Sequence, residues 1–262
     1  MSMQDLFGLK GKVALVTGGG RGIGNYIAAG LAEAGADLVL ASRKMKNLEA
    51  AAGKIEETFG SAVFPVSCDL GKAEDIDRLF DASVERFGRV DILVNNAGVT
   101  WGAPTLDFPR EQWDRLFQVN VRGVWFLTQR VARLMKEKGG GSIINISSVM
   151  AFRGSEEEFH PAVPYNSTKA AINALTMNLA VKLAPWGIRV NAIAPGYFKT
   201  DMMAYIDTPG FEKARETMLR KIPLGRVGQR EDVKGVAVFL ASAAARYVTG
   251  HVLVVDGGFL AR

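Results

Sequence analysis

Short apolar runs alternate with amphipathic stretches along the whole chain. The runs are rich in β-branched residues and are continuously apolar, which is typical of parallel strands that are covered by helices on both faces. We expect strands at residues 12–17, 37–42, 61–69, 90–96, 142–147, 189–194 and 252–256.

Between these runs, apolar residues recur at helical spacing. Residues 73–87, for example, place Ile76, Leu79 and Val84 on one face. Strands alternating with helices predict an α/β fold, a Rossmann-like doubly wound parallel sheet of seven strands with helices on both faces. We expect the helices at residues 23–34, 46–59, 73–87, 110–137, 165–184 and about 230–241.

No linker, shift in composition or internal repeat divides the chain, so residues 1–262 are predicted to form a single domain. Two long stretches, 149–164 and 195–222, carry no clear period. Loops of that length in a compact domain usually have a function.

Composition excludes several classes of protein. Of the 262 residues 48% are apolar and 23% charged, as in soluble globular proteins. The single cysteine, Cys68, excludes an internal disulfide and multi-cysteine zinc sites, and we expect no metal. The start of the chain shows no signal peptide and no apolar run is long enough to span a membrane, so we expect a cytoplasmic protein. The net charge is +5, and the basic residues are interleaved with acidic ones along the chain, which indicates a solvated surface and no nucleic-acid partner.

A glycine-rich segment, TGGGRGIG, links the first strand to the first helix. Its glycines Gly18, Gly22 and Gly24 stand at offsets 0, 4 and 6, which differ from the offsets 0, 2 and 5 of the common dinucleotide fingerprint. A loop that opens a helix turns backbone N–H groups and the helix dipole toward an anion. A phosphate-binding loop is therefore predicted, with a purely structural tight turn as the alternative.

Tyr165 and Lys169 are four residues apart in a predicted helix and share one face. An ammonium one turn away favours the phenolate, so we expect the pKa of Tyr165 to be lowered from about 10. Such a tyrosine can exchange a proton with an alcohol.

Taken together, the motifs resemble the short-chain dehydrogenase/reductase family in its core form of about 250 residues. The resemblance covers about residues 7–259 and rests on six motifs in order: Thr17–Gly24, Asn95–Gly98, Asn120, Ser148, Tyr165 with Lys169, and Pro195-Gly196.

The resemblance implies four catalytic residues. Tyr165 would be the general acid/base, and Lys169 would lower its pKa and hold the nicotinamide ribose. Ser148 would hydrogen-bond the substrate oxygen, with Ser147 as the neighbouring candidate. Asn120 would hold a water that connects Lys169 to solvent; a helix-bulge residue without a catalytic role is the alternative.

The resemblance also implies a nicotinamide cofactor, and NADP(H) is predicted over NAD(H). Ser42 stands where an NAD enzyme carries a carboxylate, Arg43 follows it, and Arg21 is a second cation in the glycine loop. A solvated charge at the strand end is the alternative for Arg43. The implied cofactor-binding residues are Gly18, Arg21, Gly22, Ile23, Gly24, Ser42, Arg43, Asp69, Leu70, Asn95, Ala97, Gly98, Tyr165, Lys169, Pro195, Gly196, Phe198 and Thr200.

One segment departs from the family pattern. Between Ser148 and Tyr165 the chain runs VMAFRGSEEEFHPAVP, several residues longer than is usual. It is either a solvated bulge or a substrate-facing lid that brings Phe152, Phe159 or His160 near the pocket. The candidate substrate contacts are Ser148, Trp101 and Phe159.

The resemblance implies an NADP(H)-dependent oxidoreductase that moves a hydride between the nicotinamide and a secondary alcohol or ketone. A 3-oxoacyl thioester reductase and a gluconate 5-dehydrogenase-like sugar oxidoreductase using NAD are alternatives, and APGYFKTDMM slightly favours the sugar group. A catalytically silent nucleotide-binding regulator is the alternative from another class. The family further implies a homotetramer.

Overall fold

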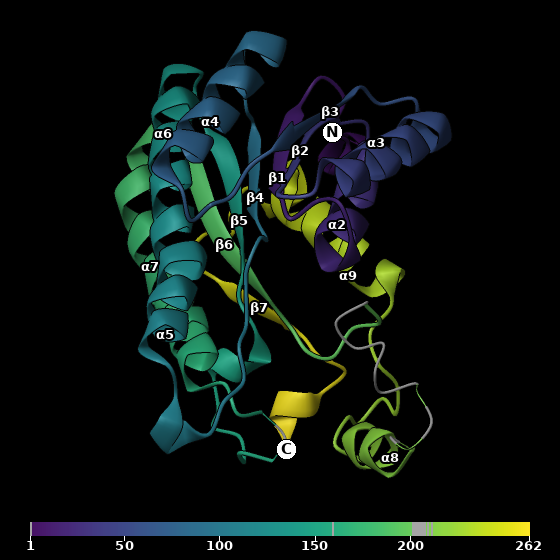
Figure 1. Ribbon diagram of the computed structural model, residues 1–262. Helices are drawn as coiled ribbons and strands as arrows, with labels where there is room; N and C mark the ends of the chain where they lie inside the picture. Colours follow the sequence, from purple (N-terminus) through teal and green to yellow (C-terminus); the bar gives the residue numbers. More distant parts are fainter. Residues whose placement is uncertain (1, 159, 201–207, 209, 211) are drawn as a thin grey trace.

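The computed structural model describes residues 2–158, 160–200, 208, 210 and 212–262 (Figure 1). Within them, seven parallel strands form one sheet in the order β3-β2-β1-β4-β5-β6-β7. The predicted fold class is confirmed, and each predicted strand is found within two residues at either end. The strands are β1 (Val13–Thr17), β2 (Asp37–Ser42), β3 (Val63–Ser67), β4 (Ile92–Asn95), β5 (Gly141–Ile146), β6 (Ile188–Pro195) and β7 (Val252–Val255).

Helices cover both faces of the sheet (Figure 1). Successive side chains of a strand point to opposite faces, so Ala14 and Val16 of β1 enter one core while Val13 and Leu15 enter the other. This explains why the strands are apolar throughout. One core is closed by α2 (Gly22–Glu33), α3 (Met45–Phe59) and α9 (Arg230–Ala241), the other by α4 (Ala73–Phe87), α6 (Val124–Glu137) and α7 (Val163–Leu183).

The prediction of one helix over 110–137 is wrong. The segment divides into α5 (Arg110–Phe117), a π-helical turn (Gln118–Gly123) and α6. Gly123 packs against the carbonyl of Leu70, where an added Cβ would collide with that oxygen. The wider turn therefore coincides with a tertiary contact. Single π-helical turns inside α-helices are frequently found at functional sites.

Two further helices lie in segments for which no helix was predicted: α1 (Met3–Phe7) and α8 (Glu212–Arg220). In the part of the chain that the structure describes, no helix is both long and apolar enough to cross a membrane.

The strand order places a topological switch point at β1, which pairs with β2 on one side and β4 on the other. Ligands of open α/β sheets bind in the crevice beyond the carboxyl ends of the strands at such a point. The glycine loop after β1 and the Asn95–Gly98 segment at the end of β4 both lie there.

Candidate active site

The glycine loop is packed too closely to accept side chains. Gly18 and Gly22 have φ angles of 68° and 55°, which favour glycine. A Cβ on Gly18 would lie 2.5 Å from Nδ2 of Asn96, and one on Gly24 would collide with the same atom. That nitrogen donates to the carbonyl of Thr17 at 2.9 Å, so Asn96 fixes the shape of the loop.

The first turn of α2 is suited to an anion. Arg21 is the N-cap residue but its side chain makes no capping hydrogen bond, so it does not occupy the N–H groups of Gly22, Ile23 and Gly24. A helix of 12 residues with an uncapped N-terminus presents these donors and its dipole to the crevice. The methyl group of Thr200 borders the loop, 3.4 Å from where a Cβ of Gly22 would stand.

Ser42 ends β2 and Arg43 follows it as an exposed side chain. The N–H of Gly18 donates to the carbonyl of Ala41 at 2.6 Å, which brings the glycine loop, with Arg21, beside this strand end. Neither Ser42 nor Arg43 is acidic, and no ion pair joins Arg43 to a described residue.

Lys169 lies one helical turn from Tyr165 on α7 and is 5% exposed. Its Nζ donates to the carbonyl of Ile146, the last residue of β5, at 2.7 Å and lies 5.6 Å from the centroid of the Tyr165 ring. Burial disfavours the ammonium and lowers the pKa of Lys169 to about 8.

The structure corrects the expectation that the pKa of Tyr165 is lowered. Burial of the phenol raises its pKa, and a hydrogen bond with the Ser148 side chain lowers it by less. Lys169 is not among the causes of this shift; its amine donates to the Ile146 carbonyl. In this state Tyr165 holds its proton, as a proton donor must.

The structure distinguishes Ser147 from Ser148, the two candidates for the serine that hydrogen-bonds the substrate oxygen. Ser147 is 2% exposed and its hydroxyl donates to the carbonyl of Lys169 at 3.3 Å, which ties β5 to α7. Ser148 caps the short 3-10 helix Val149–Ala151, accepts from the N–H of Met150 at 3.1 Å, and is the serine that faces Tyr165.

Asn120 lies in the π-helical turn and is 1% exposed. Its Nδ2 donates to the carbonyl of Val99 at 2.9 Å and to Oγ1 of Thr168 at 3.1 Å, while its Oδ1 accepts from the N–H of Val99 at 2.8 Å. A Cβ on Gly98 would lie 3.3 Å from that Oδ1 and 3.6 Å from Nζ of Lys169. The side chain of Asn120 thus holds the loop after β4 against the catalytic helix.

Several side chains of the predicted cofactor set lie in the core. Asn95 is 2% exposed, and its Nδ2 donates to Thr128 and Asn145, both at 2.9 Å. Leu70 and Phe198 are 5% and 3% exposed. Asn95, Leu70 and Phe198 would therefore contact a bound cofactor through backbone atoms rather than through their side chains.

Other members of the set hold the loops together. Asp69 Oδ1 accepts from the N–H of Gly71, and the N–H of Ala97 donates to Oγ1 of Thr17. At the end of β6, Pro195 is buried, and Gly196 packs so closely on Asp256 that a Cβ would lie 2.8 Å from its Cα.

The long segment before α7 is joined to the loop after β4. The N–H of Ala103 donates to the carbonyl of Pro161 at 2.9 Å, and the N–H and hydroxyl of Thr105 donate to the Glu157 carboxylate at 3.0 and 2.7 Å. The ring of His160 packs edge-on against Tyr165, with centroids 5.6 Å apart.

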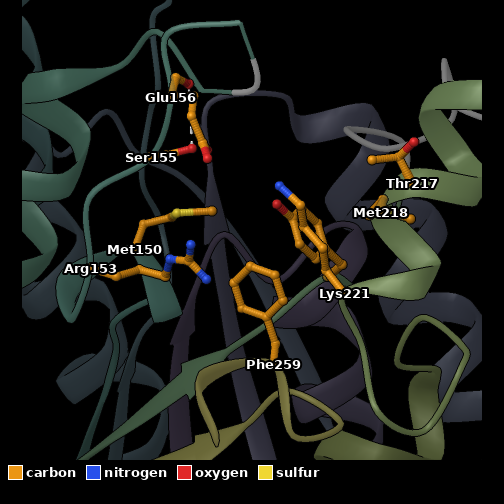
Figure 2. A pocket seen from close by; sticks show the side chains of 9 residues that line it. Met150, Arg153, Ser155, Glu156, Thr217, Met218, Lys221 and Phe259 are labelled. Carbon is orange, nitrogen blue, oxygen red and sulfur yellow. Dashed lines mark hydrogen bonds between the residues drawn. The ribbon is translucent and has the colours of Figure 1, made fainter. Parts of the chain in front are cut away.

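A cleft opens next to these residues (Figure 2). Trp101 is 43% exposed and does not line it, while Phe159 lies outside the described residues. The sequence analysis missed Thr17 and Asn96, although both stand inside quoted motifs. It also missed most of the cleft, which is lined by Met150, Arg153, Ser155, Glu156, Tyr197, Thr217, Met218, Lys221 and Phe259.

A glycine loop at the switch point of a parallel sheet, next to a buried serine, a partly buried tyrosine and a buried lysine, defines a dinucleotide-dependent oxidoreductase. The chain belongs to the short-chain dehydrogenase/reductase family and is an enzyme acting on CH–OH groups. Residues 18–260 match the family model described as enoyl-(acyl carrier protein) reductase.

Similar proteins fall in the same family. The chain is 44% identical to the 2-dehydro-3-deoxy-D-gluconate 5-dehydrogenase of Bacillus subtilis over 262 residues, 99% of each chain. It is 42% identical to the gluconate 5-dehydrogenase of Gluconobacter oxydans, covering 98% of each. The structure superposes on a gluconate 5-dehydrogenase from Burkholderia cenocepacia in complex with NADP and tartrate with a TM-score of 0.90, 38% identity and 100% coverage of both chains.

Proposed function

We propose that this protein transfers a hydride between NADP(H) and a secondary alcohol or ketone, with Tyr165 as general acid/base. The observation that carries the proposal is the convergence of Ser148, Tyr165 and Lys169 beside the glycine loop's crevice. The nicotinamide supplies the hydride donor or acceptor when the cofactor is bound.

The protein's own residues manage the proton. During reduction, the hydroxyls of Ser148 and Tyr165 donate hydrogen bonds to the substrate oxygen, and Tyr165 gives up its proton as that oxygen gains negative charge. The raised pKa of Tyr165 keeps the proton in place until then. During oxidation the same oxygen takes the proton of the alcohol, and the Lys169 ammonium, 5.6 Å from the ring centroid, stabilises the phenolate.

The crevice fits a dinucleotide. The N–H groups at the start of α2, which the Arg21 side chain does not cap, suit its pyrophosphate, and Gly98 lies so close to Asn120 and Lys169 that a side chain there would crowd both. NADP is supported by Arg43 directly after β2, by Arg21 in the glycine loop, and by solved relatives that carry bound NADP. A 2′-phosphate would meet cations there and no carboxylate.

We further propose a homotetramer in the cytoplasm, acting on a small carbonyl or alcohol substrate. Large apolar side chains exposed on α5, α6 and α7 support assembly. A buried, unpaired Cys68 agrees with a reducing compartment.

The test is hydride transfer by the purified protein with NADPH, followed by loss of its absorbance, against simple ketones, keto sugar acids and 3-oxoacyl thioesters. We expect turnover of at least one class, with NADH less efficient. Tight NADPH binding without turnover of any ketone would instead support the silent regulator.

A further inference from the structure

Two residues that line the cleft in Figure 2, Met150 and Phe259, connect it to the candidate catalytic residues. Met150, which lines it, directly follows Val149 and donates its N–H to Ser148 Oγ at 3.1 Å. Phe259, at the base of the cleft, belongs to the same apolar cluster as Tyr165. The cleft therefore lies next to the place where a substrate carbonyl would meet Ser148 and Tyr165.

Two parts of the chain form its walls (Figure 2). Met150, Arg153, Ser155 and Glu156 come from the segment after β5, and Thr217, Met218 and Lys221 come from the end of α8 and the turn that follows it. Figure 2 shows the two groups facing each other across the cleft.

The guanidinium group of Arg153 is held in place by two contacts, neither of which is with a carboxylate. Its guanidinium carbon lies 4.9 Å from the centroid of the Phe259 ring, and its Nε donates to the carbonyl of Gly154 at 3.2 Å. Among the described residues, no carboxylate lies within 4.0 Å of the Arg153 nitrogens. Among the described residues of the lining, Lys221 is a second cation and Glu156 is the one carboxylate, so these residues carry a net positive charge.

We propose that this cleft binds the carboxylate of a hydroxylated carboxylic acid, with Arg153 as its principal ligand and Lys221 as the second; the inference rests on the proposed function. Arginine offers a planar fork of donors that matches a carboxylate. The hydroxyls of Ser155 and Thr217 and the carboxylate of Glu156 provide partners for the hydroxyl groups of such a substrate. A neutral ketone in the same place would cover the Arg153 guanidinium without pairing it, which is unfavourable.

The experiment compares acids with their uncharged amides. Binding of D-gluconate and D-gluconamide, and of glycerate and glyceramide, is measured by calorimetry on the NADP⁺-loaded protein, and kcat/KM with NADP⁺ is measured for each. The variants are Arg153→Leu, Arg153→Lys and Lys221→Leu. Arg86→Leu is the matched control, because Arg86 also lies over a phenylalanine ring, at 5.0 Å, but outside the cleft.

We expect wild type to prefer at least one acid over its amide by about 10- to 100-fold, the worth of a charge-assisted hydrogen bond. Arg153→Leu should lose most of that preference through weaker acid binding and higher KM, with amide binding and kcat little changed. Arg153→Lys should recover part of it, and Arg86→Leu should match wild type.

Equal acid and amide binding by wild type, or an unchanged ratio in Arg153→Leu, would overturn the carboxylate site. Turnover of neutral ketones with NADPH in that case leaves the proposed hydride transfer intact. Acid binding that depends on Arg153, with no hydride transfer to any ketone, would support the site while contradicting the proposed function.

Discussion

The hydroxyl of Tyr165 is the atom on which the proposed proton transfer depends. Tyr165→Phe removes it while keeping the ring that packs against His160. We expect turnover to fall at least about 100-fold, because general acid/base groups contribute about 10²–10⁴-fold, with cofactor binding within a few-fold of wild type. Steady-state kinetics and NADPH titration measure both. Tyr247→Phe is the control, since Tyr247 is fully exposed, and turnover of Tyr165→Phe above about a tenth of wild type would assign the role elsewhere.

Buried Lys169 predicts how stability depends on pH. Its pKa is about 8 in the folded protein and 10.5 ordinarily, so between these values the unfolded chain binds more protons. Below pH 8 the fold must bury a charge. As pH rises from 8 toward 10.5 the folded state releases its proton, and this penalty declines.

We therefore expect the free energy of unfolding of wild type to gain about 1–2 kcal/mol relative to Lys169→Met between about pH 7 and pH 9.5. Urea titrations at each pH measure it. Lys182→Met is the matched control, because Lys182 is exposed on the same helix. Parallel stability curves for wild type and Lys169→Met would show that Lys169 keeps an ordinary pKa.

Arg43 and Ser42 are predicted to decide the choice of cofactor. Arg43→Leu should lower kcat/KM for NADPH by about 10- to 100-fold, the worth of one charge-assisted hydrogen bond, and spare NADH. Ser42→Asp should shift preference toward NADH, because a carboxylate repels a 2′-phosphate and accepts from a free ribose hydroxyl. Kinetics with both cofactors test this; equal losses for both in Arg43→Leu, or a wild type that prefers NADH, would contradict it.

Motifs located the site from sequence, but they could not orient every side chain in it. Ser148, Tyr165 and Lys169 meet because the fold brings the end of β5 to α7. The predicted direction of the Tyr165 pKa shift was wrong. The shift depends on burial and on where the Lys169 amine points, and the spacing of two residues in the sequence reveals neither.

At the scale of elements, the apolar runs predicted the strands well because each is buried on both faces. The π-helical turn Gln118–Gly123 was not predictable, since the contact of Gly123 with the Leu70 carbonyl comes from a segment far away in sequence. Helix α8 was missed because its polar sequence carries few apolar residues; its Met218 lines the cleft, where packing supports the helix.

The segment 153–163 is predicted to govern substrate choice rather than hydride transfer. Glu157 ties it to Thr105, and these hydrogen bonds hold the pKa of Glu157 below its usual value. Glu157→Ala, or shortening of the segment, should reorder substrates by kcat/KM and leave NADPH affinity unchanged.

Glu158→Ala is the matched control for Glu157→Ala. Glu158 is an exposed neighbour whose side chain makes no hydrogen bond to a described residue. The ranking is measured over acids, amides and simple ketones. The same ranking in wild type, Glu157→Ala and the shortened protein would favour the solvated-bulge interpretation of this segment.

At the scale of the molecule, one helical layer exposes several large apolar side chains, and exposed apolar patches often mark protein–protein interfaces. Trp113 of α5 and Phe126 of α6 are 41% and 39% exposed, and Met177 and Val181 of α7 are 53% and 78% exposed. Helices α5 and α7 contact each other, and α5, α6 and α7 lie on the same side of the sheet (Figure 1). Val254 of β7, 37% exposed, belongs to a second region.

This arrangement predicts a tetramer built from two different two-fold interfaces. Val181→Asp places an unpaired carboxylate in the first of them, which costs several kcal/mol on association. Light scattering should give four chains for wild type and two for Val181→Asp, because the interface around β7 remains. Met3→Asp, at an exposed methionine of α1, should stay tetrameric. A wild type that is monomeric at micromolar concentration, or a Val181→Asp protein that remains a tetramer, would show that this helical layer is not the interface.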